Sequence, residues 1–315
     1  MPSPPDIIKE LAKDMAEHAK TCWMRPGYHF LPLNGWMNDP NGTVFFNGHY
    51  HLFYQKNPWQ ETWGYMHWGH ARSSDLVYWK RLPIAFGPSY DKGEDHCYSG
   101  GAVNNDGVLT TVYTSISENR PPEQWAAISR DGVNFEKIPE NPIMTMKLHG
   151  EDEKRTDNWR DPYLWREPGE ETWHCVVGGQ LVDEGDARKK NITPTAFHYL
   201  SKDLINWKYI GPLIQGLHDE VPENHHNKDW RIPNFECPNF FPLEPSNPDN
   251  RTYCFMCAPH DRILYNVGQY IKSDSGYKFT PTRWRVFDMG KPFYATNTWI
   301  NEGRTVLIGW LRVKG

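Results

Sequence analysis

A short motif that occurs three times constrains the fold of this chain more than any other sequence feature. A serine is followed two residues later by an aspartate, and an aromatic side chain stands four residues after that, in segments 73–79, 129–135 and 201–207. The aspartates are 56 and 72 residues apart (131 − 75 and 203 − 131). Such spacing suits large four-stranded propeller blades with insertions. The motif therefore predicts one turn that recurs between the outer strands of successive blades.

The residues between these motifs have the composition of short β-strands. From residue 28 onward, runs rich in Tyr, Phe, Val and Trp alternate with Gly, Asn, Asp and Pro. Two tight hairpins are expected, at Asn47-Gly48 and at Asp106-Gly107, because these dipeptides favour two-residue turns. We therefore predict an all-β fold, a β-propeller whose inner strands converge on a central channel.

The first residues differ from the rest. Asp6 follows Pro4-Pro5 and can cap a helix over residues 6–20. We expect residues 1–27 to form an N-terminal helical extension and residues 28–315 to form the propeller domain. The acidic segment 217–230 is expected to be a loop insertion near the functional site.

Composition excludes several classes of partner. The formal net charge of −5 and the lack of a basic block argue against nucleic acid. No stretch approaches the roughly 20 apolar residues of a membrane span, and the first 20 residues carry charges throughout, unlike a signal peptide. We expect a cytoplasmic protein, unless a leader has been removed. The 15 Trp and 16 Tyr suit stacking on sugar rings, although a role in the core explains many of them equally well.

Three carboxylates stand in short motifs beside prolines, glycines or aromatic residues. They are Asp39 in GWMNDPNG, Asp161 in WRDPY and Glu236 in ECPNFF, separated by 122 and 75 residues (161 − 39 and 236 − 161). They can meet only if the fold brings distant strands to a common axis, and carboxylates gathered among aromatic residues suit glycoside hydrolysis. Each motif also has a structural interpretation: an Asx turn at Asp39, an ion pair of Arg160 with Asp161, and a solvent-facing edge-strand glutamate.

The three motifs, in this order, resemble glycoside hydrolase family 32, the β-fructofuranosidases, which include invertases, inulinases, levanases and related fructosyltransferases. The resemblance covers roughly residues 28–310 and implies five blades of four antiparallel strands. The family usually carries a C-terminal β-sandwich, which we expect to be absent because the chain stops where the last blade should close. Five further blocks are similar to that family: 53–58, 63–83, 97–103, 293–299 and 303–310.

By this resemblance Asp39 is the nucleophile, Glu236 the general acid and then base, and Asp161 the group that stabilises the transition state. The amides of Asn38 and Asn41 are expected to donate to Asp39, lower its pKa and keep it ionised. Apolar neighbours of Glu236 favour the protonated form that an acid needs. The carboxyl groups of Asp39 and Glu236 are predicted to lie about 5–5.5 Å apart, as retention requires.

Six further residues are predicted to bind substrate: Asn38, Gln55, Trp63, Ser99, Arg160 and Trp310. No metal or other cofactor is expected. The predicted function is that of a retaining glycoside hydrolase that cleaves terminal β-D-fructofuranosyl units from sucrose or short fructans. The partner is then a small carbohydrate, and a homo-oligomer is compatible with the sequence. Two alternatives stay open, a fructosyltransferase with the same residues and a catalytically silent sugar-binding propeller.

Overall fold

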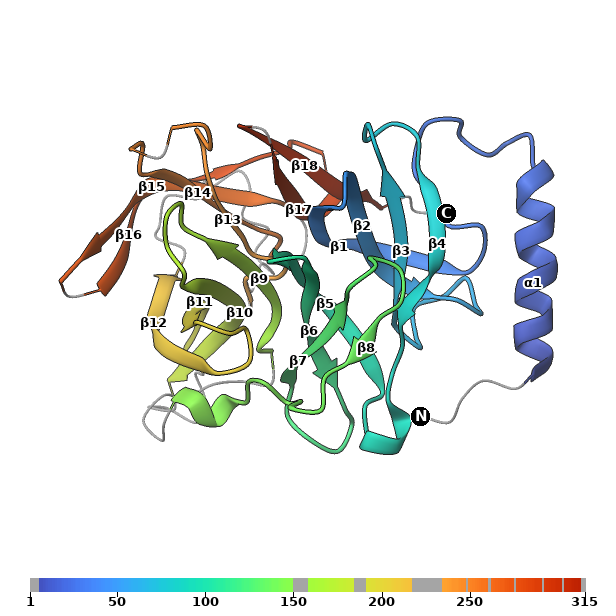
Figure 1. Cartoon of the computed structure of the whole chain (residues 1–315), viewed down its shortest axis with the longest axis horizontal. Coiled ribbons are helices and arrows are strands. Elements are labelled where there is room, and N and C mark those ends of the chain that lie inside the picture. The colour runs from blue at the N-terminus through green and yellow to red at the C-terminus, as the bar shows by residue number, and fades with distance from the viewer. Residues whose placement is uncertain are drawn as a thin grey trace.

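The fold is a ring of antiparallel β-sheets with one α-helix beside it (Figure 1). The computed structural model describes residues 6–149, 158–183, 191–216, 234–247, 249–259, 262–274, 276–290, 292–301 and 303–312. The segment 217–230, predicted to be a loop near the site, lies outside these residues. In Figure 1 the sheets follow one another around a centre in chain order, and α1 (Asp6–Thr21) stands beside the first sheet. No helix among the described residues has the length and apolar character needed to cross a membrane.

Each of the first four sheets is a blade of four strands, with neighbouring strands joined in sequence order. The first contains β1 (Trp36–Phe46), β2 (His49–Asn57), β3 (His67–Ser73) and β4 (Lys80–Phe86). The second contains β5 (His96–Asn105), β6 (Val108–Ile116), β7 (Glu123–Ser129) and β8 (Glu136–Lys137). The third contains β9 (Arg160–Arg166), β10 (Trp173–Asp183), β11 (Asn191–Ser201) and β12 (Trp207–Gln215). The fourth contains β13 (Asn239–Pro242), β14 (Thr252–Cys257), β15 (Leu264–Ser273) and β16 (Gly276–Val286).

The predicted number of four-stranded blades, five, is wrong. Four blades have four strands, and the described residues of the fifth sheet form two strands, β17 (Phe293–Asn301) and β18 (Arg304–Leu311). The first four sheets extend to Val286, and the described residues that follow pair as one hairpin, β17 with β18.

The repeated serine–aspartate motif forms the same turn in the first three blades. Ser73 Oγ donates to Asp75 Oδ1 at 2.9 Å, and the N–H groups of Val77 and Tyr78 donate to that oxygen at 2.8 Å each. The equivalent bonds form at Asp131 and Asp203. Each turn joins the third strand of its blade to the fourth, as the sequence predicts. The fourth blade replaces it with a tighter connection, from β15 to β16.

The ring closes where the fifth sheet meets the first. β17 neighbours β1, and β1 also neighbours β5. Thr43 Oγ1 donates to the Thr298 carbonyl at 2.6 Å, and Trp299 Nε1 donates to the His51 carbonyl at 2.9 Å. The first and fifth sheets are therefore held together by side-chain hydrogen bonds as well as by packing.

Irregular pairing recurs in the inner strands. The registers of β1, β5 and β17 shift between Met37 and Pro40, between Cys97 and Gly100, and between Tyr294 and Asn297. The pairing of β9 shifts beside Asp161, which has a positive φ of 66°. Bulges of this kind redirect a side chain out of the strand alternation. Here they occur at the end of the ring where the carboxylates gather.

Candidate active site

A pocket of about 840 Å³ opens at this end of the ring. A volume of this size is typical of sites for small molecules. Nine lining residues are those singled out from the sequence: Asn38, Asp39, Gln55, Trp63, Ser99, Arg160, Asp161, Glu236 and Trp310. The structure thus brings together residues from the first, second, third and fifth sheets and from the segment that precedes β13.

Asp39 lies in the irregular part of β1 and accepts a hydrogen bond from Ser99 Oγ at 2.7 Å. Burial raises the pKa of Asp39, and the negative charge of Glu236 raises it further, against the opposing effect of hydrogen bonds from Ser99 and Asn38. The predicted lowering is therefore wrong, because desolvation of the carboxylate outweighs its donors. The predicted bond from Asn41 is also wrong: this side chain is fully buried and has no hydrogen-bond partner among the described residues.

Asp161 is held in a left-handed backbone conformation, which is costly for a residue other than glycine and is typical of functional sites. Its N–H donates to Thr114 Oγ1 at 2.9 Å, and the Cys237 N–H donates to its Oδ2 at 3.0 Å. Burial raises the pKa of Asp161 to about 7, although Arg160 acts in the opposite direction. Asp161 is therefore a deeply desolvated carboxyl group that can take up a proton near neutrality.

Glu236 is held at both carboxylate oxygens. Arg160 binds one oxygen and the Tyr294 hydroxyl donates to the other. The Arg160 guanidinium also donates to Asn158 Oδ1 at 2.9 Å and lies 3.8 Å from Asp161 Oδ2, so the ion pair considered from the sequence does form. Burial lowers the pKa of Arg160, but the charges of Asp161 and Glu236 outweigh this and raise it. Arg160 therefore stays charged and links the two carboxylates.

Close backbone approach brings Glu236 to this position. The glycine at position 178 of β10 packs against the Phe235 carbonyl, and a Cβ on Gly178 would lie 1.9 Å from that oxygen. Any larger residue would displace the segment that carries Glu236.

The remaining predicted residues form the floor and rim of the pocket. Gln55 is buried and its amide donates to the Cys97 carbonyl at 3.0 Å. Trp63 is half exposed at the rim, 5.2 Å from the His96 ring. Trp310 contacts Trp36 edge to face at 5.9 Å. Exposed aromatic surface around buried polar groups is an arrangement that suits a sugar.

Several residues of the pocket were not identified as site residues from the sequence. Tyr294, Asn158 and Cys237 line it, together with Trp36 and the segment 116–122. Tyr294 stands in the 293–299 block that resembles the family, but nothing local in that block indicates a bond to Glu236, 58 residues earlier. Only the position of β17 in the ring brings the two together.

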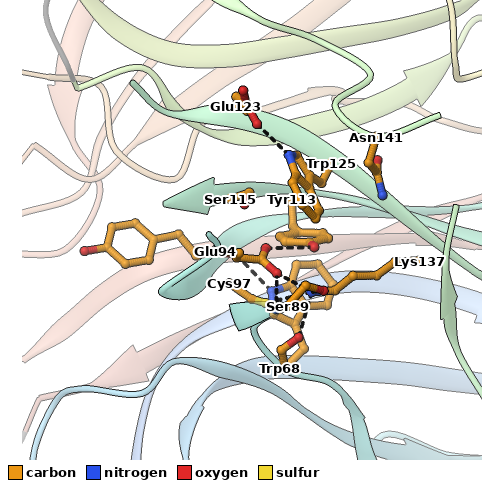
Figure 2. A network of polar contacts seen from close by, with 12 residues as sticks. Trp68, Ser89, Glu94, Cys97, Tyr113, Ser115, Glu123, Trp125, Lys137 and Asn141 are labelled. Atoms are coloured by element: carbon orange, nitrogen blue, oxygen red, sulfur yellow. Dashed lines mark hydrogen bonds and ion pairs between the residues drawn. The ribbon is translucent and has the colours of Figure 1, made fainter. Parts of the chain in front are cut away.

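A buried polar network supports the strand that carries Ser99 (Figure 2). Glu94 is fully buried and forms an ion pair with Lys137 of β8. Tyr113 donates to the same carboxylate at 2.9 Å, and Lys137 Nζ also donates to Ser89 Oγ at 3.0 Å. Figure 2 shows these groups gathered between Trp68 and Trp125. The network fixes Glu94 five residues before Ser99, and so restrains the start of β5.

This ring of sheets with clustered carboxylates is the architecture of a glycoside hydrolase propeller. The chain belongs to glycosyl hydrolases family 32, because residues 29–314 match the N-terminal domain of that family.

Known relatives agree with this assignment. The sucrose-6-phosphate hydrolase of Zymomonas mobilis is 35% identical over 98% of this chain and 59% of its own length. The raffinose invertase of Escherichia coli is 32% identical over 91% of this chain and 57% of its own length. The solved β-fructofuranosidase of Bombyx mori superposes with a TM-score of 0.76 at 29% identity, over 97% of this chain and 61% of that one. A mutant of the Bombyx mori enzyme was solved in complex with sucrose. The chain spans about three fifths of the length of these relatives.

Proposed function

We propose that this protein is a retaining β-fructofuranosidase that releases a terminal β-D-fructofuranosyl unit from sucrose or a short fructan. One observation carries the proposal: Asp39, Asp161 and Glu236 line a single pocket in a chain that belongs to family 32. Two carboxyl groups on either side of a glycosidic bond are the minimum that double displacement needs. The names of the relatives, sucrose-6-phosphate hydrolase and invertase, agree with fructosyl release.

In the first step, an Asp39 oxygen attacks the anomeric carbon C2 of the fructosyl unit. The bond between C2 and the leaving oxygen breaks, and Glu236 gives its proton to that oxygen. In the second step, Glu236 takes a proton from water, whose oxygen attacks C2 and releases Asp39 as a carboxylate. The predicted separation of about 5–5.5 Å between the two carboxyl groups stays a prediction of this scheme.

The neighbouring groups have defined parts in this reaction. The bond from Ser99 to Asp39 directs the carboxylate and stabilises its ionised form. Asp161 binds hydroxyls of the sugar, in bonds that tighten as positive charge develops on the ring. Asn38, Gln55 and Trp63 hold the fructosyl unit, and Trp310 lines the rim. Arg160 acts on the substrate chiefly through Glu236, because its guanidinium already binds that carboxylate and Asn158.

The test is to incubate the purified protein with concentrated sucrose and to quantify free glucose and free fructose separately. We expect both sugars to be released, and Asp39→Ala to lower kcat by about 10⁴-fold or more, the scale seen when a nucleophile is removed. Asp249→Ala is the matched control, because Asp249 is an exposed aspartate between β13 and β14. Near-full activity of Asp39→Ala would overturn the nucleophile assignment.

The same assay separates the alternatives. Glucose in excess of fructose would identify a fructosyltransferase, since the fructosyl unit then passes to a second sugar. Binding of sucrose without release of either sugar would identify a silent binding propeller.

A further inference from the structure

The loop between β6 and β7 forms one wall of the pocket. Segment 116–122, which includes this loop, lines the pocket. Glu118 and Asn119 are exposed, whereas Asp161 and Ser99 lie buried at the bottom of the pocket. If the fructosyl unit occupies the bottom, between Asp39 and Glu236, then the leaving group extends toward the exposed mouth. The wall is therefore placed to contact the leaving group, and this inference rests on the proposed function.

The wall is firmly anchored. The Glu118 N–H donates to Asp95 Oδ2 at 2.8 Å, and the Asp95 N–H donates to the Ile116 carbonyl at the same distance. Arg120 Nη2 donates to Ser115 Oγ at 2.7 Å. Since backbone and side-chain bonds hold both ends of the loop, the side chain of Glu118 projects from a fixed base.

The described residues of the wall and floor carry more negative than positive charge, which opposes an anionic leaving group. Among the described residues that line the pocket, Arg120 and Arg160 are the only cations, against the four carboxylates of Asp39, Glu118, Asp161 and Glu236. Arg120 is neutralised by Glu123, 3.1 Å away, and Arg160 by Glu236. Among the described residues, no hydrogen bond or ion pair joins the Glu118 carboxylate to another side chain, and this exposed carboxylate lines the pocket.

We propose that the wall selects a neutral sugar as leaving group, and that Glu118 disfavours a substrate phosphorylated on its glucosyl unit. The protein then prefers sucrose to sucrose-6-phosphate, in contrast to the substrate named for several relatives. A phosphate dianion about 7 Å from one exposed carboxylate is disfavoured by roughly two- to sevenfold, depending on the salt concentration. The neutral hydroxyls of a glucosyl unit can instead donate to Glu118 and accept from Asn119.

The experiment compares kcat/KM for sucrose and for sucrose-6-phosphate in the wild type, Glu118→Gln and Glu118→Lys. We expect the wild type to prefer sucrose, Glu118→Gln to shift the ratio toward the phosphorylated sugar by about threefold, and Glu118→Lys by about tenfold. High salt should reduce these shifts if they are electrostatic. Glu140→Gln is the matched control, because Glu140 is an exposed glutamate that does not line the pocket.

Two further outcomes complete the test. A wild type that prefers sucrose-6-phosphate, or a ratio that Glu118→Lys leaves unchanged, would overturn the inference while leaving fructosidase activity intact. If neither sugar were hydrolysed, the proposed function would fail. Dissociation constants of the two sugars for Asp39→Ala would then decide the inference, with tighter binding of sucrose expected and equal or absent binding overturning it.

Discussion

Replacing Lys137 by methionine tests whether the network of Figure 2 stabilises the second blade. Methionine keeps the length of the side chain but removes its charge, and leaves the Glu94 carboxylate fully buried without its cation. Breaking a buried pair from one side costs about 3–5 kcal/mol. The lower end applies here, because Tyr113 and the Ser89 N–H still donate to Glu94. We therefore expect Lys137→Met to lower the free energy of unfolding by about 3 kcal/mol.

Thermal and denaturant unfolding would measure this change. For a protein of 315 residues, about 3 kcal/mol corresponds to a fall in Tm of roughly 4–6 °C. Lys80→Met is the matched control, because Lys80 is an exposed lysine of β4, and its Tm should stay close to that of the wild type. The double variant Lys137→Met with Glu94→Gln should recover more than half of the loss, because no unpaired buried charge remains. A loss below about 1 kcal/mol in Lys137→Met would refute this account of the network.

Three other predictions concern protons and hydrogen bonds. Burial raises the pKa of Asp161 to about 7, so the contribution of this group to the free energy of unfolding falls as the pH rises from about 4 to about 7. Asp161→Asn should therefore raise Tm at pH 7.5 relative to the wild type, with little change at pH 4.5, while kcat falls about 10- to 100-fold. Tyr294→Phe removes a donor to Glu236 and should lower kcat about 10- to 100-fold with a smaller change in KM, measured by steady-state kinetics. His51 pairs with His70 inside the first blade, and burial lowers the pKa of His51 to about 4. Unfolding therefore takes up protons between about pH 6.5 and 4. We expect Tm to fall as the pH is lowered through this range, and to fall less in His51→Gln.

Each of these predictions has a result that contradicts it. The pKa assignment of Asp161 would be wrong if Asp161→Asn changed Tm equally at the two pH values. Unchanged kcat in Tyr294→Phe would show that Arg160 alone holds Glu236 in its working position. A pH profile of Tm that is identical in the wild type and in His51→Gln would remove the histidine pair from the explanation of acid sensitivity.

Local patterns predicted local structure well. The turn at Asp75, Asp131 and Asp203 depends on bonds within five residues, and the N-terminal helix depends on its own amphipathic periodicity. The carboxylates could be singled out because each stands in a distinctive short motif. A propeller brings its inner strands to one axis, and this arrangement predicted that the three carboxylates share a site.

What the sequence did not predict depends on contacts between distant segments. The pKa of Asp39 follows from its burial by the closed ring, and no local donor pattern reports that burial. Asn41 lies two residues from Asp39 yet forms no hydrogen bond with it among the described residues, and the register of β1 shifts on both sides of Pro40-Asn41. The bond from Tyr294 to Glu236 likewise depends on the place of β17 in the ring, next to the segment that precedes β13.

Because the pocket residues are distributed over the ring, no single sheet of the propeller holds a complete site. Asp39 and Ser99 come from the first two sheets, Asp161 from the third and Tyr294 from the fifth, which is held to the first by the bonds of Thr43 and Trp299. Catalytic rate is thus a sensitive reporter of ring closure. A substitution that loosens the seam between β17 and β1 should reduce turnover before spectroscopy detects any loss of strands.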